Sequence, residues 1–149
     1  MRLTDHFTLE ELTQSETAAR RRIDNTPSTA IVEHLTRTAH TLEQVRTLLG
    51  SHPVLVSSGY RSPALNAVVG GAANSAHMTG LAADFICPGF GTPLEICRKV
   101  AASGIVFDQL IQEGTWVHIG LARVGQKSRQ QALTANFGAG GTTYTSGIA

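Results

Sequence analysis

The spacing of hydrophobic residues predicts a long helix in the first third of the chain. Apolar residues recur at intervals of three and four from residue 31 to residue 49, which is the pattern of a helix with one buried face. Ser28 is suited to cap its first turn and Gly50 to end it. Thr8 and Thr92 are each followed three positions later by a glutamate, which predicts two further helix starts. The second of these helices should end near residue 104.

After Pro53 the pattern changes to short apolar runs of the kind found in buried strands. The expected strands cover residues 54–56, 81–86, 108–113, 116–121 and 130–133. Gly114 and Thr115 separate two of them and form the two-residue turn of a hairpin. Residues 57–74 are rich in Ser, Gly, Pro and Asn, which predicts a long loop with one helical turn near residues 64–68. Loops of this length in compact domains are often functional.

Composition sets the size and the broad class of the protein. The chain has 149 residues, of which 42% are hydrophobic and 15% charged, and its net charge is +1. These values indicate one folded domain and argue against a disordered chain. The balanced charge argues against a nucleic-acid binder that works by neutralising phosphates. We expect a single domain over residues 1–137, followed by a flexible Gly/Thr-rich tail over residues 138–149.

Cysteine content and apolar segments exclude further classes of protein. The two cysteines, Cys87 and Cys97, are too few for a disulfide scaffold and are expected to be reduced core residues, although a disulfide between them is the alternative. No apolar run approaches the roughly 20 residues of a membrane span. The first six residues contain no apolar segment, so the sequence predicts no signal peptide.

Three residues stand out as candidate metal ligands. Asp84 lies inside an apolar strand and His118 lies among apolar residues of another. A buried carboxylate is costly unless it is paired or bound to a metal. His77 lies in the loop that leads into the Asp84 strand. Two imidazoles and one carboxylate suit zinc, and three protein ligands leave a fourth position for water.

The expected hairpin adds a candidate general base. A turn at residues 114–115 pairs Ile111 with His118 and Glu113 with Trp116, so these four side chains share one face. Glu113 then lies diagonally across from His118, where a carboxylate can take a proton from water and return it to a leaving amine. An exposed carboxylate at the end of a hairpin is the alternative interpretation of Glu113. Trp116 is a candidate substrate contact on the same face.

Several segments resemble motifs of one known family, the M15 zinc peptidases. Residues 75–84, Ser-Ala-His-Met-Thr-Gly-Leu-Ala-Ala-Asp, resemble its Ser-x-His-x-x-Gly-x-Ala-x-Asp motif. Trp-Val-His at 116–118 is similar to its second motif, and residues 58–62 are similar to its upstream Gly-Tyr-Arg-Ser motif. Residues 7–12 resemble the N-terminal segment of the phage and prophage branch. Together the motifs span roughly residues 3–134 in the right order.

The resemblance implies a fold and a set of residue roles. The family fold is a small α+β domain with an antiparallel sheet and flanking helices, shared with the Hedgehog signalling domain. His77, Asp84 and His118 match the ligands of one zinc ion. Arg61 matches an arginine that holds the carboxylate of the substrate or polarises its carbonyl, and Ser75 matches a serine that lines the site. The guanidinium fork of Arg61 suits carboxylates chemically, although a structural arginine that binds loop carbonyls is the alternative.

One position departs from the family pattern. Many members carry the catalytic acid three residues before the last zinc histidine, and Thr115 stands there in this chain. A threonine cannot serve as the base. We therefore expect Glu113, five residues before His118, to take that role.

The function implied is zinc-dependent hydrolysis of peptide bonds in peptidoglycan stem peptides. The bond is either L-Ala–D-Glu, in an endopeptidase, or D-Ala–D-Ala, in a carboxypeptidase. The expected partner is bacterial peptidoglycan and the expected state is a monomer. We expect synthesis in the host cytoplasm of a phage or prophage lysis enzyme that reaches the wall through a holin or as a virion component. A non-catalytic, Hedgehog-like zinc domain and a metal-free phage structural domain are the alternatives.

Overall fold

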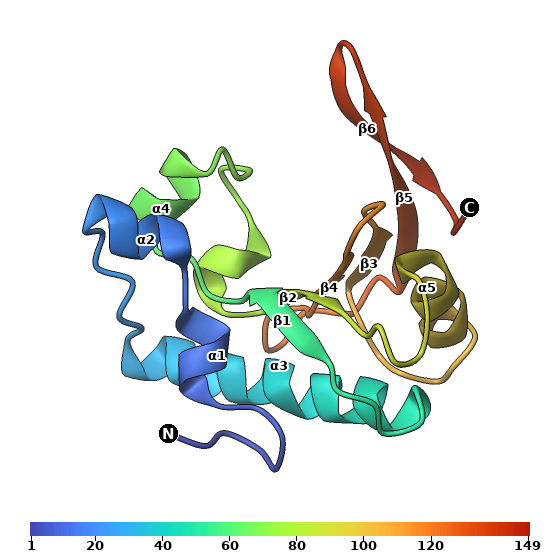
Figure 1. Cartoon of the computed structure of the whole chain (residues 1–149), viewed down its shortest axis with the longest axis horizontal. Coiled ribbons are helices and arrows are strands. Elements are labelled where there is room, and N and C mark those ends of the chain that lie inside the picture. The colour runs from blue at the N-terminus through green and yellow to red at the C-terminus, as the bar shows by residue number, and fades with distance from the viewer.

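A six-stranded sheet forms the centre of the computed structural model, which describes all 149 residues (Figure 1). The strand order is β1-β2-β4-β3-β5-β6. All neighbours are antiparallel except β3 and β5, which are parallel. The strands are β1 (Leu55–Ser58), β2 (Ala82–Ile86), β3 (Gln109–Gln112), β4 (Val117–Gly120), β5 (Gln131–Gly138) and β6 (Gly141–Ser146). The expected α+β class with a mostly antiparallel sheet is confirmed.

Five α-helices and one 3₁₀-helix surround the sheet. They are α1 (Leu9–Thr13), α2 (Glu16–Arg21), α3 (Thr29–Leu48), α4 (Pro63–Val68), the 3₁₀-helix η1 (Ala76–Thr79) and α5 (Pro93–Ala101). The predicted caps are confirmed, because Ser28 caps α3 while Thr8 and Thr92 form complete capping boxes. None of the helices combines the length and the apolar character that a bilayer crossing demands.

Successive side chains of a strand point to opposite faces of the sheet. One face packs into the hydrophobic core, and the other is called the open face. The core-face side chains of β2, β3 and β4 are fully buried in one cluster with side chains of α3 and α5. They are Ala83, Phe85, Leu110, Val117 and Ile119. Residues between them in sequence, including Asp84 and His118, therefore point to the opposite face. Helix α3 runs below the sheet while α2 and α4 stand to one side (Figure 1).

The tail expected over residues 138–149 differs in the structure. Residues 141–146 form β6, which pairs with β5 from Leu133↔Ser146 to Gly138↔Gly141. Every residue of β6 is exposed, so no alternation of apolar and polar positions marks the strand in the sequence. Thr and Tyr are nevertheless strand-forming residues, and the glycines at 138–141 supply the turn. The strand expected at residues 130–133 is β5 in the structure, and it extends to Gly138.

The last residues of the chain are held against the sheet. Thr134 Oγ1 donates to Gly147 O at 2.7 Å and accepts from Ala149 N at 2.9 Å. Ile148 packs against the hydrophobic core. The β5–β6 hairpin is therefore fixed at its base, and it projects beyond the body of the domain (Figure 1).

The two cysteines are both free and buried. Burial raises the pKa of the Cys97 thiol to about 12. The thiol is therefore protonated at neutral pH and packs as a small apolar group.

An ion pair fixes the connection between β4 and β5 to the start of β3. The carboxylate of Asp108 accepts hydrogen bonds from Arg129 N at 3.0 Å, Nε at 3.1 Å and Nη2 at 2.8 Å. Hydrogen bonding to Arg129 lowers the pKa of Asp108.

Asp108→Asn should lower the free energy of unfolding by about 1 kcal/mol at pH 7. Because the pKa of Asp108 is lower in the folded chain than in the unfolded chain, the ion pair stabilises the protein above the ordinary carboxyl range. That contribution is lost as the pH falls through the folded-state pKa. Urea denaturation of both proteins from pH 7 to pH 3 measures the difference. A difference that stays constant with pH would contradict this role of the charge.

Candidate metal centre

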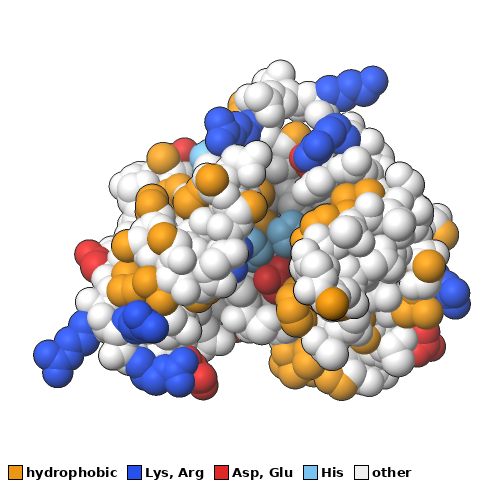
Figure 2. Space-filling view, turned by 90° about the horizontal axis from the view of Figure 1, so that it is seen from above, with side chains coloured by type: hydrophobic (Ala, Val, Ile, Leu, Met, Phe, Trp, Pro, Cys, Tyr) orange, Lys and Arg blue, Asp and Glu red, His pale blue; other side chains and the backbone are white.

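Three side chains from three elements meet on the open face of the sheet. His77 comes from η1, Asp84 from β2 and His118 from β4, and their potential ligand atoms all lie within 4.8 Å of one another. Asp84 Oδ1 lies 3.2 Å from His77 Nε2 and 2.9 Å from His118 Nδ1. Figure 2 shows histidine and acidic side chains at the bottom of a cleft between two lobes. The structure thus brings together the three residues expected from the sequence.

Sheet register explains how two of these residues meet. Asp84 and His118 are direct cross-strand partners in the antiparallel β2–β4 pair. Ile111 is the partner of His118 on β3, as the hairpin pattern predicted. Directly opposed residues share a face, so the carboxylate and the imidazole are neighbours once the apolar residues on either side of them enter the core.

The backbone around η1 sets the orientation of His77. Ser75 caps η1, and its Oγ accepts a hydrogen bond from His77 N. His77 Nδ1 lies 2.7 Å from Gly59 O and donates its proton to that carbonyl. With the Nδ1 proton on this carbonyl, Nε2 is the ring atom left to face Asp84, and a metal that binds there would replace the proton shared with the carboxylate. Such a partner for the second ring nitrogen fixes the tautomer and the ring orientation of a ligand histidine.

Gly59, which supplies this carbonyl, has a packing reason to be glycine. A Cβ at this position would lie 2.3 Å from Leu12 O. The next residue, Tyr60, donates its backbone N–H to the same oxygen at 2.7 Å. The segment after β1 therefore lies directly against the end of α1, and this contact places the carbonyl that orients His77.

The carboxylate of the cluster is ionised. Burial alone would raise the pKa of Asp84, but hydrogen bonds with His118 and His77 outweigh burial and hold the pKa well below its usual range. An ionised carboxylate beside two imidazoles is a donor set for a divalent cation.

Arg61 borders the cluster, and its guanidinium has no acidic hydrogen-bond partner. Its Nη2 donates to Ser75 Oγ at 3.3 Å, and its backbone N donates to His77 O at 3.0 Å. Arg61 Nε is buried without a hydrogen-bond partner. The side chain of Arg61 donates only to a neutral hydroxyl. Its positive charge therefore suits the carboxylate of a ligand. The interpretation in which Arg61 ties down loop carbonyls is wrong, because its side chain bonds none.

A hollow of about 670 Å³ lies beside Arg61. It is bordered by residues 14–17, 19 and 20 on one side and by Ser57, Ser58 and Tyr60 on the other. None of the three cluster residues lines this hollow, but Ser58, which does, is the cross-strand partner of Asp84. There is room for a ligand beside Arg61.

Glu113 lies at the end of β3, in the tight turn predicted at residues 114–115. Its backbone N donates to Trp116 O at 3.0 Å, and Thr115 N donates to Glu113 O at 3.0 Å. Burial raises the pKa of Glu113 and the charge of Asp84 acts in the same direction, whereas His118 opposes the shift. The side chain is thus partly desolvated and within electrostatic reach of both Asp84 and His118. Trp116, across the turn, is 36% exposed.

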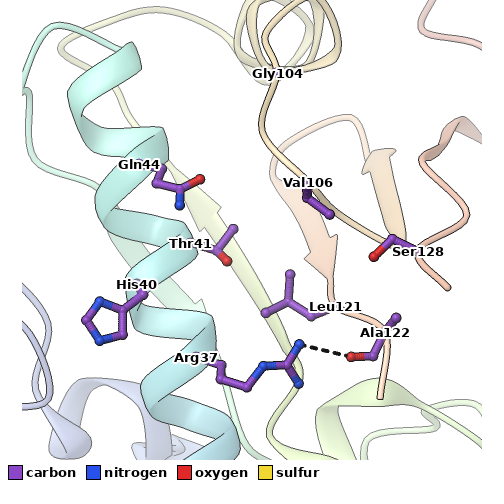
Figure 3. A pocket seen from close by; sticks show the side chains of 9 residues that line it. All are labelled: Arg37, His40, Thr41, Gln44, Gly104, Val106, Leu121, Ala122 and Ser128. Carbon is purple, nitrogen blue, oxygen red and sulfur yellow. Dashed lines mark hydrogen bonds between the residues drawn. The ribbon is translucent and has the colours of Figure 1, made fainter. Parts of the chain in front are cut away.

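A second hollow, of about 460 Å³, lies between α3 and residues 104–128 (Figure 3). Arg37 Nη2 donates to Ala122 O across it at 3.2 Å. None of the cluster residues lines this hollow, so it is separate from the candidate metal centre.

Comparison with known proteins agrees with the geometry of the cluster. A model of the peptidase M15 family matches residues 5–120. The chain belongs to the peptidase M15 family. Membership implies the Hedgehog/DD-peptidase fold, in agreement with the mixed α+β architecture described above. The matched range contains His77, Asp84, His118, Arg61 and Glu113.

One relative is named as a zinc enzyme. The chain is 49% identical over 43 residues to the zinc D-Ala-D-Ala carboxypeptidase of Streptomyces albus G. This segment covers 29% of the chain and 17% of the length of that relative. The likeness to this zinc enzyme is therefore confined to a short segment of each chain.

The M15 match ends at residue 120, before β5 and β6. Two exposed aromatic residues, Phe137 and Tyr144, lie in this part of the chain. The sequence interpretation missed both because they fall at the edge of, or inside, the segment taken as a tail. Two aromatic residues among glycines and threonines are the signal that could have drawn attention to them.

Proposed function

We propose that this M15 family member is a zinc-dependent peptidase that cuts a peptide bond in peptidoglycan stem peptides. The observation that carries the proposal is the cluster of His77, Asp84 and His118 with the partly desolvated Glu113 on the same face of the sheet. A non-catalytic zinc domain needs the three ligands but has no use for a partly buried carboxylate beside them.

The donor set matches one zinc ion. The three protein ligands would be His77 Nε2, the ionised carboxylate of Asp84 and His118 Nδ1. When bound, zinc would polarise the scissile carbonyl and lower the pKa of a water molecule in the fourth position.

Glu113 is the proposed general base. It accepts a proton from the attacking water and delivers it to the departing amine. Its pKa is raised chiefly by burial, which strengthens a carboxylate as a proton acceptor. Thr115 lies on the turn two residues further along and cannot act in this way.

Arg61 is the proposed binding group for a substrate carboxylate. Its guanidinium has no acidic hydrogen-bond partner, and the adjoining hollow provides room for an anion. Ser75 holds the guanidinium through Nη2. Trp116, the neighbour of Glu113 across the turn, is a proposed substrate contact. Stem peptides carry free carboxylates at side chains and at the C-terminus, so one arginine can position them.

Two bonds are compatible with this site, and digestion distinguishes them. Defined peptidoglycan fragments are incubated with the protein, with and without a chelator, and the products are identified by mass spectrometry. Release of D-Ala alone identifies a carboxypeptidase, which the short match to the Streptomyces albus G enzyme favours. A freed peptide that begins at D-Glu identifies an endopeptidase. Absence of any chelator-sensitive product would contradict the proposal.

Arg61→Met should lower kcat/KM on the cleaved fragment by about 100-fold, mainly through KM, because a charge-assisted bidentate contact is lost. Arg61→Lys should restore part of the loss, since the charge returns without the fork. Steady-state kinetics measure both effects, and zinc content measured by mass spectrometry should stay at the wild-type value. An unchanged KM in the Met variant would remove Arg61 from the substrate site.

A further inference from the structure

The face of the sheet that carries the metal cluster continues onto the β5–β6 hairpin. Register places Ile111 beside Leu133 and Gln112 beside Thr134 in the parallel β3–β5 pair. Continuing this register by one residue places Glu113 level with Ala135. Ala135 in turn is the direct partner of Tyr144 on β6. Because paired residues share a face, Tyr144 belongs to the same cross-strand row as Glu113.

The hairpin is in contact with the turn that carries Glu113. A Cβ on Gly114 would lie 3.3 Å from Phe137 Cε2, so the Phe137 ring covers this glycine closely. Gln112 Nε2 donates to Ala149 O at 3.3 Å. The hairpin is therefore positioned against the β3–β4 turn on one side and by the last residues of the chain on the other.

Tyr144 carries a hydrogen-bond donor that is available to a ligand. Its side chain is 52% exposed. Burial of the covered part raises the pKa of the phenol, and the negative charges of Glu113 and Asp84 act in the same direction. The hydroxyl is thus within electrostatic reach of both carboxylates and is protonated at neutral pH. No hydrogen bond contributes to the shift, so the proton remains free for a ligand.

Tyr144 and Arg61 lie on opposite sides of the cluster. In the order β1-β2-β4-β3-β5-β6, Arg61 follows the strand at one edge and Tyr144 lies on the strand at the other. Asp84 and His118 lie between them, on β2 and β4. The two lobes that border the cleft in Figure 2 agree with this order, and in Figure 1 the hairpin rises on the side away from α2 and α4. A peptide that reaches from Arg61 across the cluster is directed toward the hairpin.

We propose that Tyr144 is a substrate-positioning residue, whose hydroxyl donates a hydrogen bond to a backbone carbonyl of the bound peptide on the side of the metal cluster away from Arg61. Phe137 holds the hairpin in the position that this contact requires. The inference rests on the proposed peptidase function and extends it, since it makes residues beyond the family match part of the substrate groove.

The test compares Tyr144→Phe with Thr143→Ala in the zinc-loaded protein. The first removes only a hydroxyl, and the second changes a neighbouring residue on the opposite face of β6. The probe is a stem pentapeptide that begins with L-Ala–D-Glu and ends with D-Ala–D-Ala and so contains both candidate bonds. Calorimetry gives its Kd on proteins that also carry Glu113→Gln, in which cleavage is suppressed, and steady-state kinetics give KM and kcat with Glu113 intact.

Tyr144→Phe should raise Kd and KM about fivefold, the effect of one neutral hydrogen bond, with kcat within about twofold of wild type. Thr143→Ala should leave all three unchanged. Unchanged Kd and KM in Tyr144→Phe, or an equal loss in Thr143→Ala, would overturn the inference even if the protein hydrolyses the peptide. A protein that binds the peptide through Tyr144 but releases no product would support the inference and contradict the peptidase function.

Discussion

Asp84→Asn will abolish stoichiometric zinc binding and lower peptide hydrolysis by on the order of a thousandfold or more. Asp84 supplies the only negative charge among the three candidate ligands, and its oxygen contacts both histidines. The amide has the same shape but is a neutral and weaker ligand. Metal content measured by mass spectrometry on dialysed protein, together with the rate on the cleaved fragment, checks both parts.

Asp84→Asn has a matched control in Asp108→Asn, which removes a carboxylate from the ion pair with Arg129 at the start of β3. That variant should keep one zinc ion per chain and the wild-type rate. Wild-type protein should also gain thermal stability when zinc is added, because a ligand that binds only the folded state stabilises it. Asp84→Asn should gain none. One zinc ion per chain in Asp84→Asn would remove this carboxylate from the metal centre.

Two of the three metal ligands could be predicted from the sequence pattern because each of them interrupts an apolar strand. Asp84 and His118 are polar residues at alternating positions of apolar strands, and alternation fixes the face on which they lie. The two-residue turn fixed the register of His118 against Ile111, which the structure confirms. The capped helices were predictable for a similar reason, since Thr8 and Thr92 carry their glutamate partners three residues away.

Contacts between distant segments could not be predicted in this way. The carbonyl of Gly59 that orients His77 lies 18 residues before it in sequence, and no periodicity connects the two. Strand β6 has no buried residue, so its sequence lacks the alternation that marks other strands. Its place depends on pairing with β5 and on the bonds that hold residues 147–149. The apolar periodicity of the sequence indicates which polar residues lie in buried strands. Tertiary packing decides which of these residues come into contact.

Glu113→Gln will lower kcat by about a thousandfold while zinc content stays at the wild-type value. The amide keeps the size of the side chain but cannot accept the proton of the attacking water. Glu113→Asp keeps the carboxylate and moves it back by one methylene, so it should retain measurable activity above that of the Gln variant. Single-turnover hydrolysis of the cleaved fragment compares the three proteins. A Gln variant within tenfold of wild type would transfer the base role to another group.

Glu113→Gln should lower kcat but raise the free energy of unfolding of the metal-free protein. The pKa of Glu113 is raised in the folded chain, chiefly by burial, so its ionised form is less favourable there than in the unfolded chain. Ionised Glu113 therefore destabilises the metal-free protein at neutral pH, and the penalty is lost as the pH falls below the ordinary carboxyl range. Glu113→Gln removes the charge and should make the chelator-treated protein more stable to urea at pH 7. A structural carboxylate would instead lose stability on replacement, so increased stability with loss of turnover would assign Glu113 to the reaction.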